Sequence, residues 1–408
     1  MKKDPHIAVI GGGLSGTVLA VELAKRGIRS TVFDTGEHGI GGRLATRDAV
    51  EGSLGVKKGS SPPSLVFDHA AQYFTADDPA FQAMVDDWKQ RGLVTEWRGK
   101  VGTLVPGGDF APEEDAGPRY VGAGGMRALC EGILAEQVEE GIVEIKRPCW
   151  VSDMLSVEDG WKLTGRQKDY LLDKPYDVVV IAHNGKCANR LVSTAGVPAV
   201  LRQLRALKLS AIWAGMFAFE EPVAAPGGLE GAFIKGSEVL SWAGNNSAKL
   251  GVVHDDNPGR QCWTLFSTGK YGKANKVPQE SVPPAKAAEV QAAMLAAFSL
   301  AMGGVELPAP SFQRVQLWGA ALPINTPRVP CILDAAGRVG VVGDWLTSSS
   351  MQAAALSGAD MAMRIDGMRG KSAAEAGYLS IGLDAKFTPV GGEDIGSFPS
   401  KVPVKAKA

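Results

Sequence analysis

The sequence is poor in the residues on which disulfide frameworks and metal centres depend. Its 408 residues include only five cysteines and five histidines, and these are scattered, without a Cys-x-x-Cys pair or a metal-ligand spacing. We therefore expect no metal, and we expect the cysteines to be reduced structural residues of an intracellular protein. The cysteines are Cys130, Cys149, Cys187, Cys262 and Cys331.

The sequence also lacks an excess of charge and any long apolar run. A net charge of −1 gives no electrostatic reason to expect nucleic acid or an anionic membrane as a partner. The longest weakly polar helical stretch, residues 290–302, is shorter than the roughly 20 residues that a membrane span requires. The first predicted strand begins at residue 6, which leaves no room for a targeting peptide. We expect a cytoplasmic protein, or a plastid protein if such a peptide has been removed.

What the sequence does contain is the composition of a globular protein with more than one core. Hydrophobic residues make up 45% and charged residues 21% of the chain, as in ordinary globular proteins. A chain of 408 residues exceeds what a single hydrophobic core usually organises. Two domains, or one domain with two lobes, are therefore expected.

The most informative stretch begins with a predicted buried strand at residues 6–10. This strand leads straight into Gly-x-Gly-x-x-Gly at residues 11–16. Apolar residues then recur at helical spacing, and a second predicted strand at residues 30–33 ends at Asp34. The order of strand, glycine turn, helix, strand and acid is the one that a dinucleotide site requires. An ordinary tight strand–helix turn is the alternative.

Each part of this stretch has a physical role in such a site. The first glycine permits the tight turn, the second lets backbone N–H groups approach a pyrophosphate, and the third lets helix and strand pack closely. The helix N-terminus directs partial positive charge toward the phosphates, and the acid accepts hydrogen bonds from a ribose. The predicted site consists of Gly11, Gly13, Leu14, Ser15, Gly16, Asp34 and Thr35.

A second glycine-rich turn, residues 39–47, contains Arg43 and ends on Arg47. Backbone flexibility followed by a forked cation is what a second approach to a pyrophosphate needs. Arg43 could instead pair with a carboxylate, and Arg47 could be a structural ion-pair partner. Residues 51–64, rich in Gly, Ser, Pro and Lys, are predicted to form a surface loop.

The middle of the chain predicts a separate lobe. From about residue 209, short aromatic strands between turns are typical of an antiparallel sheet, and residues 285–302 predict a helix that covers it. Trp213 and Trp318 are core candidates first and walls of a substrate pocket second. Residues 106–118 are predicted as a loop at a domain boundary.

The last third of the chain again shows the pattern of a nucleotide-binding domain, as the N-terminal part does. A predicted strand at residues 338–345 carries Gly343 and Asp344, and serines then cap a predicted helix that begins at Met351. We predict a discontinuous nucleotide-binding domain, a substrate domain and a flexible C-terminal tail. Their boundaries are 1–75, 118–208 and 325–370 for the first, 76–117 and 209–324 for the second, and 371–408 for the tail.

Four motifs follow one another in a fixed order along the chain. They are the N-terminal fingerprint, Gly41-Gly42-Arg43 with Ala45-Thr46-Arg47, Phe67-Asp68-His69 with Gln72-Tyr73-Phe74, and Gly343-Asp344-Trp345. This ordered set resembles the renalase-like branch of the FAD-dependent amine oxidase superfamily, a group of NAD(P)/FAD-dependent oxidoreductases. The resemblance spans roughly residues 6 to 367.

This resemblance implies an α/β fold: a Rossmann-like, two-dinucleotide-binding-domain FAD fold with an inserted antiparallel-sheet substrate domain. It also implies non-covalent FAD. In addition, no cysteine lies in a setting that resembles the covalent flavin attachment of monoamine oxidases. Arg43 and Asp344 would contact the pyrophosphate and ribityl chain, and Arg47 would lie near the flavin ring. The FAD residues implied beyond the N-terminal site are Gly42, Arg43, Arg47, Gln72, Tyr73, Phe74, Gly343, Asp344, Met351 and Ala354.

The function that the resemblance implies is oxidation of a small reduced donor, with O2 as the acceptor. The leading hypothesis is a dihydronicotinamide-type donor that transfers hydride to flavin N5, a reaction that needs no strong protein base and so leaves the catalytic residues unnamed. Gln316-Leu317 replaces a basic pair of the family. A desaturase or amine oxidase acting on an apolar, isoprenoid-like substrate is therefore a second hypothesis. A non-catalytic, FAD-binding regulatory protein is the third.

Overall fold

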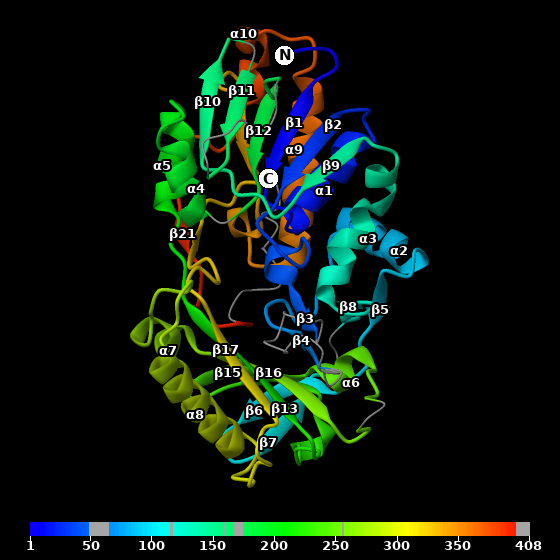
Figure 1. The fold of residues 1–408 in the computed structure, drawn as a ribbon, viewed down its shortest axis with the longest axis vertical. Coiled ribbons are helices and arrows are strands. Elements are labelled where there is room, and N and C mark those ends of the chain that lie inside the picture. Colours follow the sequence, from blue (N-terminus) through cyan, green and yellow to red (C-terminus); the bar gives the residue numbers. More distant parts are fainter. Residues whose placement is uncertain are drawn as a thin grey trace, which may run out of the picture.

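The computed structural model describes residues 1–48, 65–114, 117–158, 160–166, 174–183, 185–254 and 257–396. The predicted loop at 51–64 and the predicted tail end at 401–408 lie outside the described residues. Figure 1 shows an α/β lobe, which contains β1 (His6–Ile10), and a second lobe built on an antiparallel sheet. Among the described residues, none of the helices has the length and apolarity needed to cross a bilayer.

The α/β lobe is built on a six-stranded sheet with the order β19-β20-β12-β1-β2-β9. Its pairs are parallel apart from β19, which runs antiparallel to β20. The central strand β12 is buried along its whole length, as its unbroken apolar sequence predicts for a parallel strand covered on both faces. The bounds are β1 His6–Ile10, β2 Arg29–Phe33, β9 Val143–Lys146, β12 Val178–Ile181, β19 Ile332–Asp334 and β20 Val339–Val341.

Helices cover both faces of this sheet. On one face α1, α3 and α9 pack on β1 and β2, and on the other α4, α5 and the β10–β11 hairpin pack on β12 and β20. The N-terminal part of α1 packs closely on the middle of α9 at Gly358. Only glycine allows this approach, because a Cβ at Gly358 would be 2.4 Å from the Ser15 carbonyl oxygen. The bounds are α1 Leu14–Ala24, α3 Met126–Glu139, α4 Gly185–Val192, α5 Pro198–Ala206, α9 Met351–Gly367, β10 Asp153–Val157 and β11 Gly160–Thr164.

The second lobe is a seven-stranded sheet with the order β17-β13-β16-β15-β14-β6-β7. One face packs on α8 (Pro284–Ala301), as predicted, and its neighbouring strands are antiparallel except for β14 with β6. The strands are β6 Val101–Val105, β7 Asp109–Pro112, β13 Ile212–Phe219, β14 Gly231–Ile234, β15 Leu240–Asn245, β16 Gln261–Ser267 and β17 Phe312–Trp318.

The prediction of a loop over residues 106–118 is wrong for its first part. Asp109–Pro112 forms β7, which pairs with β6 after a turn in which Gly107 and Gly108 both have positive φ. The missing information was non-local, because β6 is held in the sheet by β14, far along the chain.

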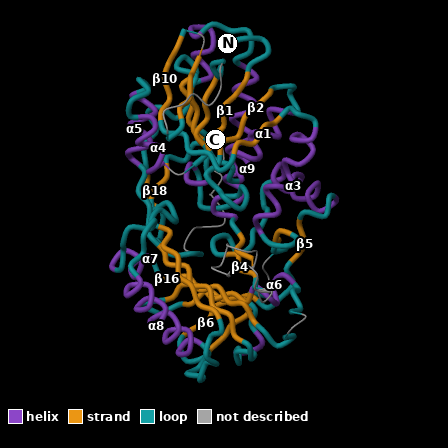
Figure 2. The backbone as a smooth tube through the Cα atoms, viewed as in Figure 1, coloured by secondary structure: helices purple, strands orange, loops and turns teal. Residues whose placement is uncertain are grey.

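Short elements join the two lobes and complete the chain. The β3–β4 hairpin lies between the lobes, close to α6, and β21 pairs with β18 (Figures 1 and 2). These are β3 Thr46–Asp48, β4 Val66–Asp68, α2 Pro79–Gln90, β5 Val94–Glu96, β8 Tyr120–Gly122, α6 Asn246–Leu250, α7 Gly269–Ala274, β18 Asn325–Thr326, α10 Ala373–Ala376 and β21 Thr388–Pro389. Short 3-10 turns lie at Gly42–Leu44, Pro226–Gly228, Asp344–Leu346 and Gly377–Leu379. The predicted domain boundaries stay a prediction.

Candidate functional site

A cleft of about 2270 Å³ takes its walls from both lobes. This volume exceeds the roughly 300–1,000 Å³ of an ordinary small-molecule site, so the cleft has room for more than one small molecule. Of the predicted site residues, only Gly16 does not line the cleft, since it is buried behind the glycine turn. Those that line it are Gly11, Gly13, Leu14, Ser15, Asp34, Thr35, Gly42, Arg43, Arg47, Gln72, Tyr73, Phe74, Gly343, Asp344, Met351 and Ala354.

The three fingerprint glycines differ in what surrounds them. Gly11 has φ of 119°, which permits the tight turn, and a Cβ at Gly16 would lie only 2.1 Å from the Gly11 carbonyl oxygen. At Gly13 a Cβ would meet nothing closer than 3.8 Å, so this position opens onto the cleft. Gly13 also supplies no side-chain cap, and the first N–H groups of α1 are therefore available to an anion.

Asp34 closes the glycine turn. One of its carboxylate oxygens accepts the Gly12 N–H and the other accepts the Gly36 N–H, both at 2.7 Å. Each carboxylate oxygen can accept a further hydrogen bond. The predicted role of Asp34 toward a ribose is therefore compatible with its position in the cleft wall.

Arg43 and Asp344, both predicted to contact the cofactor, bind each other. The guanidinium donates to the two carboxylate oxygens at 2.5 and 2.9 Å, and also to the Ala321 carbonyl at 3.0 Å. Burial works against the charge of Arg43, but Asp344 outweighs it and raises the pKa of the arginine. Pairing of Arg43 with a carboxylate, the alternative that the sequence left open, is thus present. This ion pair joins the second glycine-rich turn to the late Gly-Asp motif.

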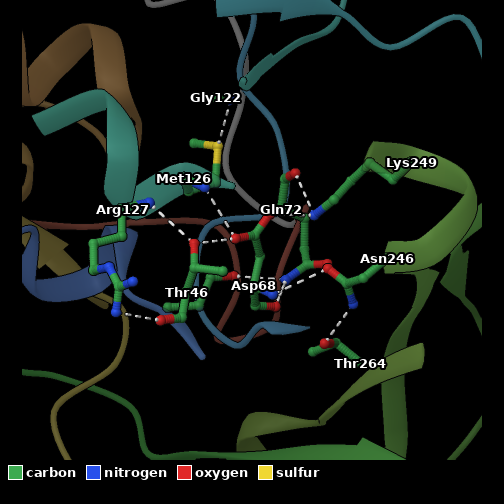
Figure 3. Close-up of polar contacts among 10 residues, drawn as sticks. Thr46, Asp68, Gln72, Gly122, Met126, Arg127, Asn246, Lys249 and Thr264 are labelled. Atoms are coloured by element: carbon green, nitrogen blue, oxygen red, sulfur yellow. Dashed lines mark hydrogen bonds and ion pairs between the residues drawn. The ribbon is translucent and has the colours of Figure 1, made fainter. Parts of the chain in front are cut away.

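A buried ion pair fixes the segment that lines the centre of the cleft (Figure 3). The Lys249 ammonium lies 2.7 Å from Asp68 Oδ2, and the two side chains are only 2% and 0% exposed. The same ammonium donates to the Gln72 carbonyl at 3.1 Å. Burial lowers the pKa of Lys249, and the Asp68 charge opposes that shift.

The other carboxylate oxygen of Asp68 completes this network. It accepts the Thr46 hydroxyl at 2.6 Å and the Met126 N–H, at the start of α3, at 3.0 Å. The Gln72 side chain donates back to the Asp68 carbonyl. Asp68 and Lys249 therefore position residues 68–74 rather than contact a ligand. Sequence reasoning missed Lys249, because it stands 181 residues from Asp68 without a motif around it.

The free face of the second-lobe sheet forms the other side of the cleft. Side chains alternate between the two faces of a strand, so Trp318 lines the cleft whereas Trp213 packs in the core against α8. Trp213 is therefore a core residue, as first expected, whereas Trp318 is a wall of the cleft, the second alternative. The sheet residues that line the cleft are Ile212, Phe233, Trp242, Phe266, Arg314, Gln316 and Trp318.

Two cations meet at one corner of this face. Arg47 of β3 donates to the Gln316 side chain at 2.9 Å, and Arg314 stands two residues before Gln316 on β17. Burial and the Arg314 charge lower the pKa of Arg47 to about 10, so it stays cationic at neutral pH. Arg314, Gln316 and Trp318 are spaced two residues apart, which already indicates in the sequence that they share one face of a strand. Sequence reasoning did not use this pattern.

His69 lies beside this corner as a neutral ring. It stacks on Trp318 at a centroid distance of 5.5 Å, and the Trp318 indole N–H donates to its carbonyl at 2.9 Å. Burial, together with the charges of Arg47 and Arg314, lowers the pKa of His69 to about 3.

This lowered pKa predicts an acid sensitivity. Between its ordinary value of 6.5 and about 3, His69 is protonated in the unfolded chain but not in the folded one. Stability therefore falls as the pH falls through this window, by about 2 kcal/mol from pH 7 to pH 5. Urea unfolding at the two pH values should show a correspondingly smaller loss for His69→Gln. His38→Gln, at an exposed histidine, is the control and should lose as much stability as the parent protein. An equal loss of stability between pH 7 and pH 5 in the parent protein, His69→Gln and His38→Gln would contradict the prediction.

Comparisons with known proteins agree with this architecture. Residues 9–88 match the family model of NAD(P)-binding Rossmann-like domains. Putrescine oxidase, in a wild-type structure bound to putrescine, superposes with a TM-score of 0.61 at 13% identity, covering 89% of this chain and 99% of that one. Cyclohexylamine oxidase from Brevibacterium oxydans IH-35A gives 0.60 at 12% identity, covering 89% and 98%. Reduced UDP-galactopyranose mutase gives 0.62 at 11% identity, covering 92% and 97%.

These likenesses confirm the fold class. The chain has the Rossmann-like, two-dinucleotide-binding-domain fold of the FAD-dependent oxidoreductases, with an inserted antiparallel-sheet domain. The same fold carries two amine oxidases and a sugar-nucleotide mutase. The reaction must therefore be argued from the cleft, because fold alone does not decide it.

Proposed function

We propose that the protein is an FAD-dependent oxidase that holds FAD non-covalently in the α/β end of the cleft. Three features of this chain fit the cofactor: the open position at Gly13, the Asp34 carboxylate, and the N-termini of α1 and α9, which both line the cleft. Ser350 caps α9 through the Ala353 N–H at 3.1 Å. When bound, FAD supplies a two-electron acceptor.

We propose a dihydronicotinamide-type donor with renalase-like chemistry, and O2 as the final acceptor. The carrying observation is that Arg47 and Arg314 line the cleft beside the aromatic sheet face of Trp242 and Phe233. A flat ring can stack on aromatic side chains, and phosphates can pair with arginines. An isoprenoid offers no anionic group to the two arginines, so this corner of the cleft favours a donor that carries phosphates.

In this proposal the protein acts mainly by positioning. The aromatic face orients the donor ring, and the arginines fix its charged end. Lys249 and Asp68 act indirectly, by holding residues 68–74 in place. Neutral His69 adds an uncharged wall beside the two cations.

An anaerobic stopped-flow experiment tests the proposed function. The purified protein is mixed with NADH, NADPH and their dihydro isomers while flavin absorbance is followed. We expect rapid bleaching by the isomers, little by ordinary NADH or NADPH, and recovery on admitting air. An N-methyl dihydronicotinamide isomer, which has no phosphates, should show a KM about tenfold higher than the corresponding dinucleotide isomer, because it cannot pair with the arginines.

Two other outcomes separate the alternative functions. A yellow protein that none of these donors reduces would contradict the proposed dihydronicotinamide-type donor. It would favour either an enzyme with an apolar substrate or a regulatory flavoprotein. Of these, the apolar face of Ile212, Phe233 and Phe266 favours the substrate. A colourless protein that takes up no added FAD would overturn the proposal as a whole.

A further inference from the structure

The C-terminal strap, which we define as residues 387–396, crosses from the α/β lobe to the second lobe. At its start the Phe387 ring stacks on Trp345, beside the late Gly-Asp motif, at a centroid distance of 6.3 Å. Thr388–Pro389 (β21) then pairs with Asn325–Thr326 (β18), and the Val390 N–H donates to the Ile324 carbonyl at 3.0 Å. The first half of the strap is therefore tied to the α/β side of the cleft.

The second half of the strap is tied to the other lobe. The Asp394 carboxylate accepts the N–H of Gly269, the first residue of α7, at 2.5 Å. Glu393 packs so closely on this glycine that a Cβ at Gly269 would lie 2.9 Å from the Glu393 Cβ. The strap thus has an anchor on each lobe.

The end of the strap reaches the aromatic face of the cleft. Ile395 and Gly396 both line the cleft, and Ile395 packs partly buried against the core that includes Trp242. A Cβ at Gly396 would lie 2.5 Å from the Phe233 ring, so only glycine allows this approach. The Phe233 ring in turn contacts Trp242 at a centroid distance of 4.8 Å.

We propose that the strap, through residues 394–396, forms the outer wall of the donor compartment and sets the size of the donor that it admits. This inference rests on the proposed function, which places the donor on the same aromatic face. The cleft keeps about 2270 Å³ with the strap seated, more than twice an ordinary small-molecule site. The strap is therefore a wall of the compartment and not a plug that fills it.

The test compares two pairs of matched variants. A chain that ends at Gly391 loses the Asp394 anchor and the cleft-lining end, whereas a chain that ends at Gly396 keeps both. Asp394→Ala removes the anchor alone, and Glu393→Ala, at an exposed neighbouring side chain, is its control. Circular dichroism and thermal midpoints establish that each variant is folded. If the truncated chain does not fold, Asp394→Ala carries the test.

The first measurement does not depend on turnover. Iodide quenching of bound-flavin fluorescence, at constant ionic strength, reports how open the compartment is. We expect the quenching constant to rise at least about twofold in the chain ending at Gly391 and in Asp394→Ala, and to stay unchanged in both controls. Unchanged quenching in all four variants would overturn the proposal.

The second measurement uses donors of two sizes. For a small donor we expect KM to rise about fivefold in the two strap variants with kcat little changed, and for a donor with a bulky ring substituent we expect KM to fall. If KM for the small donor also fell in the two strap variants, the strap would be a plug that fills the compartment, and the proposal that it forms a wall would be overturned. If no dihydronicotinamide reduces the flavin, the proposed function fails, while iodide quenching still decides the role of the strap.

Discussion

Gly13→Ala is expected to fold normally and to lose FAD. Gly13 has φ of −74°, which any residue adopts, and a new Cβ would meet no protein atom closer than 3.8 Å. The methyl group would instead occupy the space where the pyrophosphate has to approach the N-terminus of α1. We expect FAD affinity to fall about 100-fold, which corresponds to about 2.7 kcal/mol. Flavin fluorescence titration measures the affinity, and circular dichroism measures the fold.

Two further glycine variants make this result specific. Gly377→Ala adds a Cβ in open space and in helical backbone, remote from the cleft, and it should bind FAD like the parent protein. Gly16→Ala should instead destabilise the fold, since its Cβ would press on the Gly11 carbonyl. If Gly13→Ala binds FAD with the parent affinity, this end of the cleft is not the dinucleotide site.

Lys249→Met is expected to destabilise the protein by about 3–5 kcal/mol, because it leaves the Asp68 carboxylate buried without its counter-charge. Urea unfolding at pH 7 measures the change. The exposed pair of Lys270 and Glu238 gives a matched control: its side chains are 80% and 78% exposed, and Lys270→Met should change stability by less than about 0.5 kcal/mol.

A double variant isolates the ion pair from the rest of the network. Asp68→Asn with Lys249→Met removes both charges, and most of the stability lost in Lys249→Met should return. Losses that simply add in the double variant would show that the two residues do not act as a pair.

The fold alone does not choose the substrate. Putrescine oxidase and cyclohexylamine oxidase share the architecture of this chain, as does UDP-galactopyranose mutase. The cleft of this chain has a cationic corner at Arg47 and Arg314, set beside an aromatic sheet face. Under the proposed function, we expect donor specificity to depend on the second lobe and cofactor binding to depend on the first.

The sequence by itself determined the parts whose interactions are local. The turn from Gly11 to Gly16 and the acid at Asp34 lie within one strand–helix–strand unit, so their spacing in the sequence predicts how they are arranged in space. The buried strand β12, the cap of α9 at Ser350 and the helix over the antiparallel sheet likewise follow from periodicity and capping within short windows. The local pattern was enough to predict a dinucleotide site.

Only the tertiary structure decided the contacts between distant segments. Asp68 meets Lys249 across 181 residues, and Arg43 meets Asp344 across 301. The cationic corner joins Arg47 to Gln316 across 269 residues, and the strap brings Gly396 to Phe233. No periodicity records such pairs, because a side chain's partner across a cleft depends on how whole lobes pack rather than on its neighbours in the chain. The end of the cleft at the glycine turn was therefore predictable from the sequence, and the end at the aromatic sheet face was not.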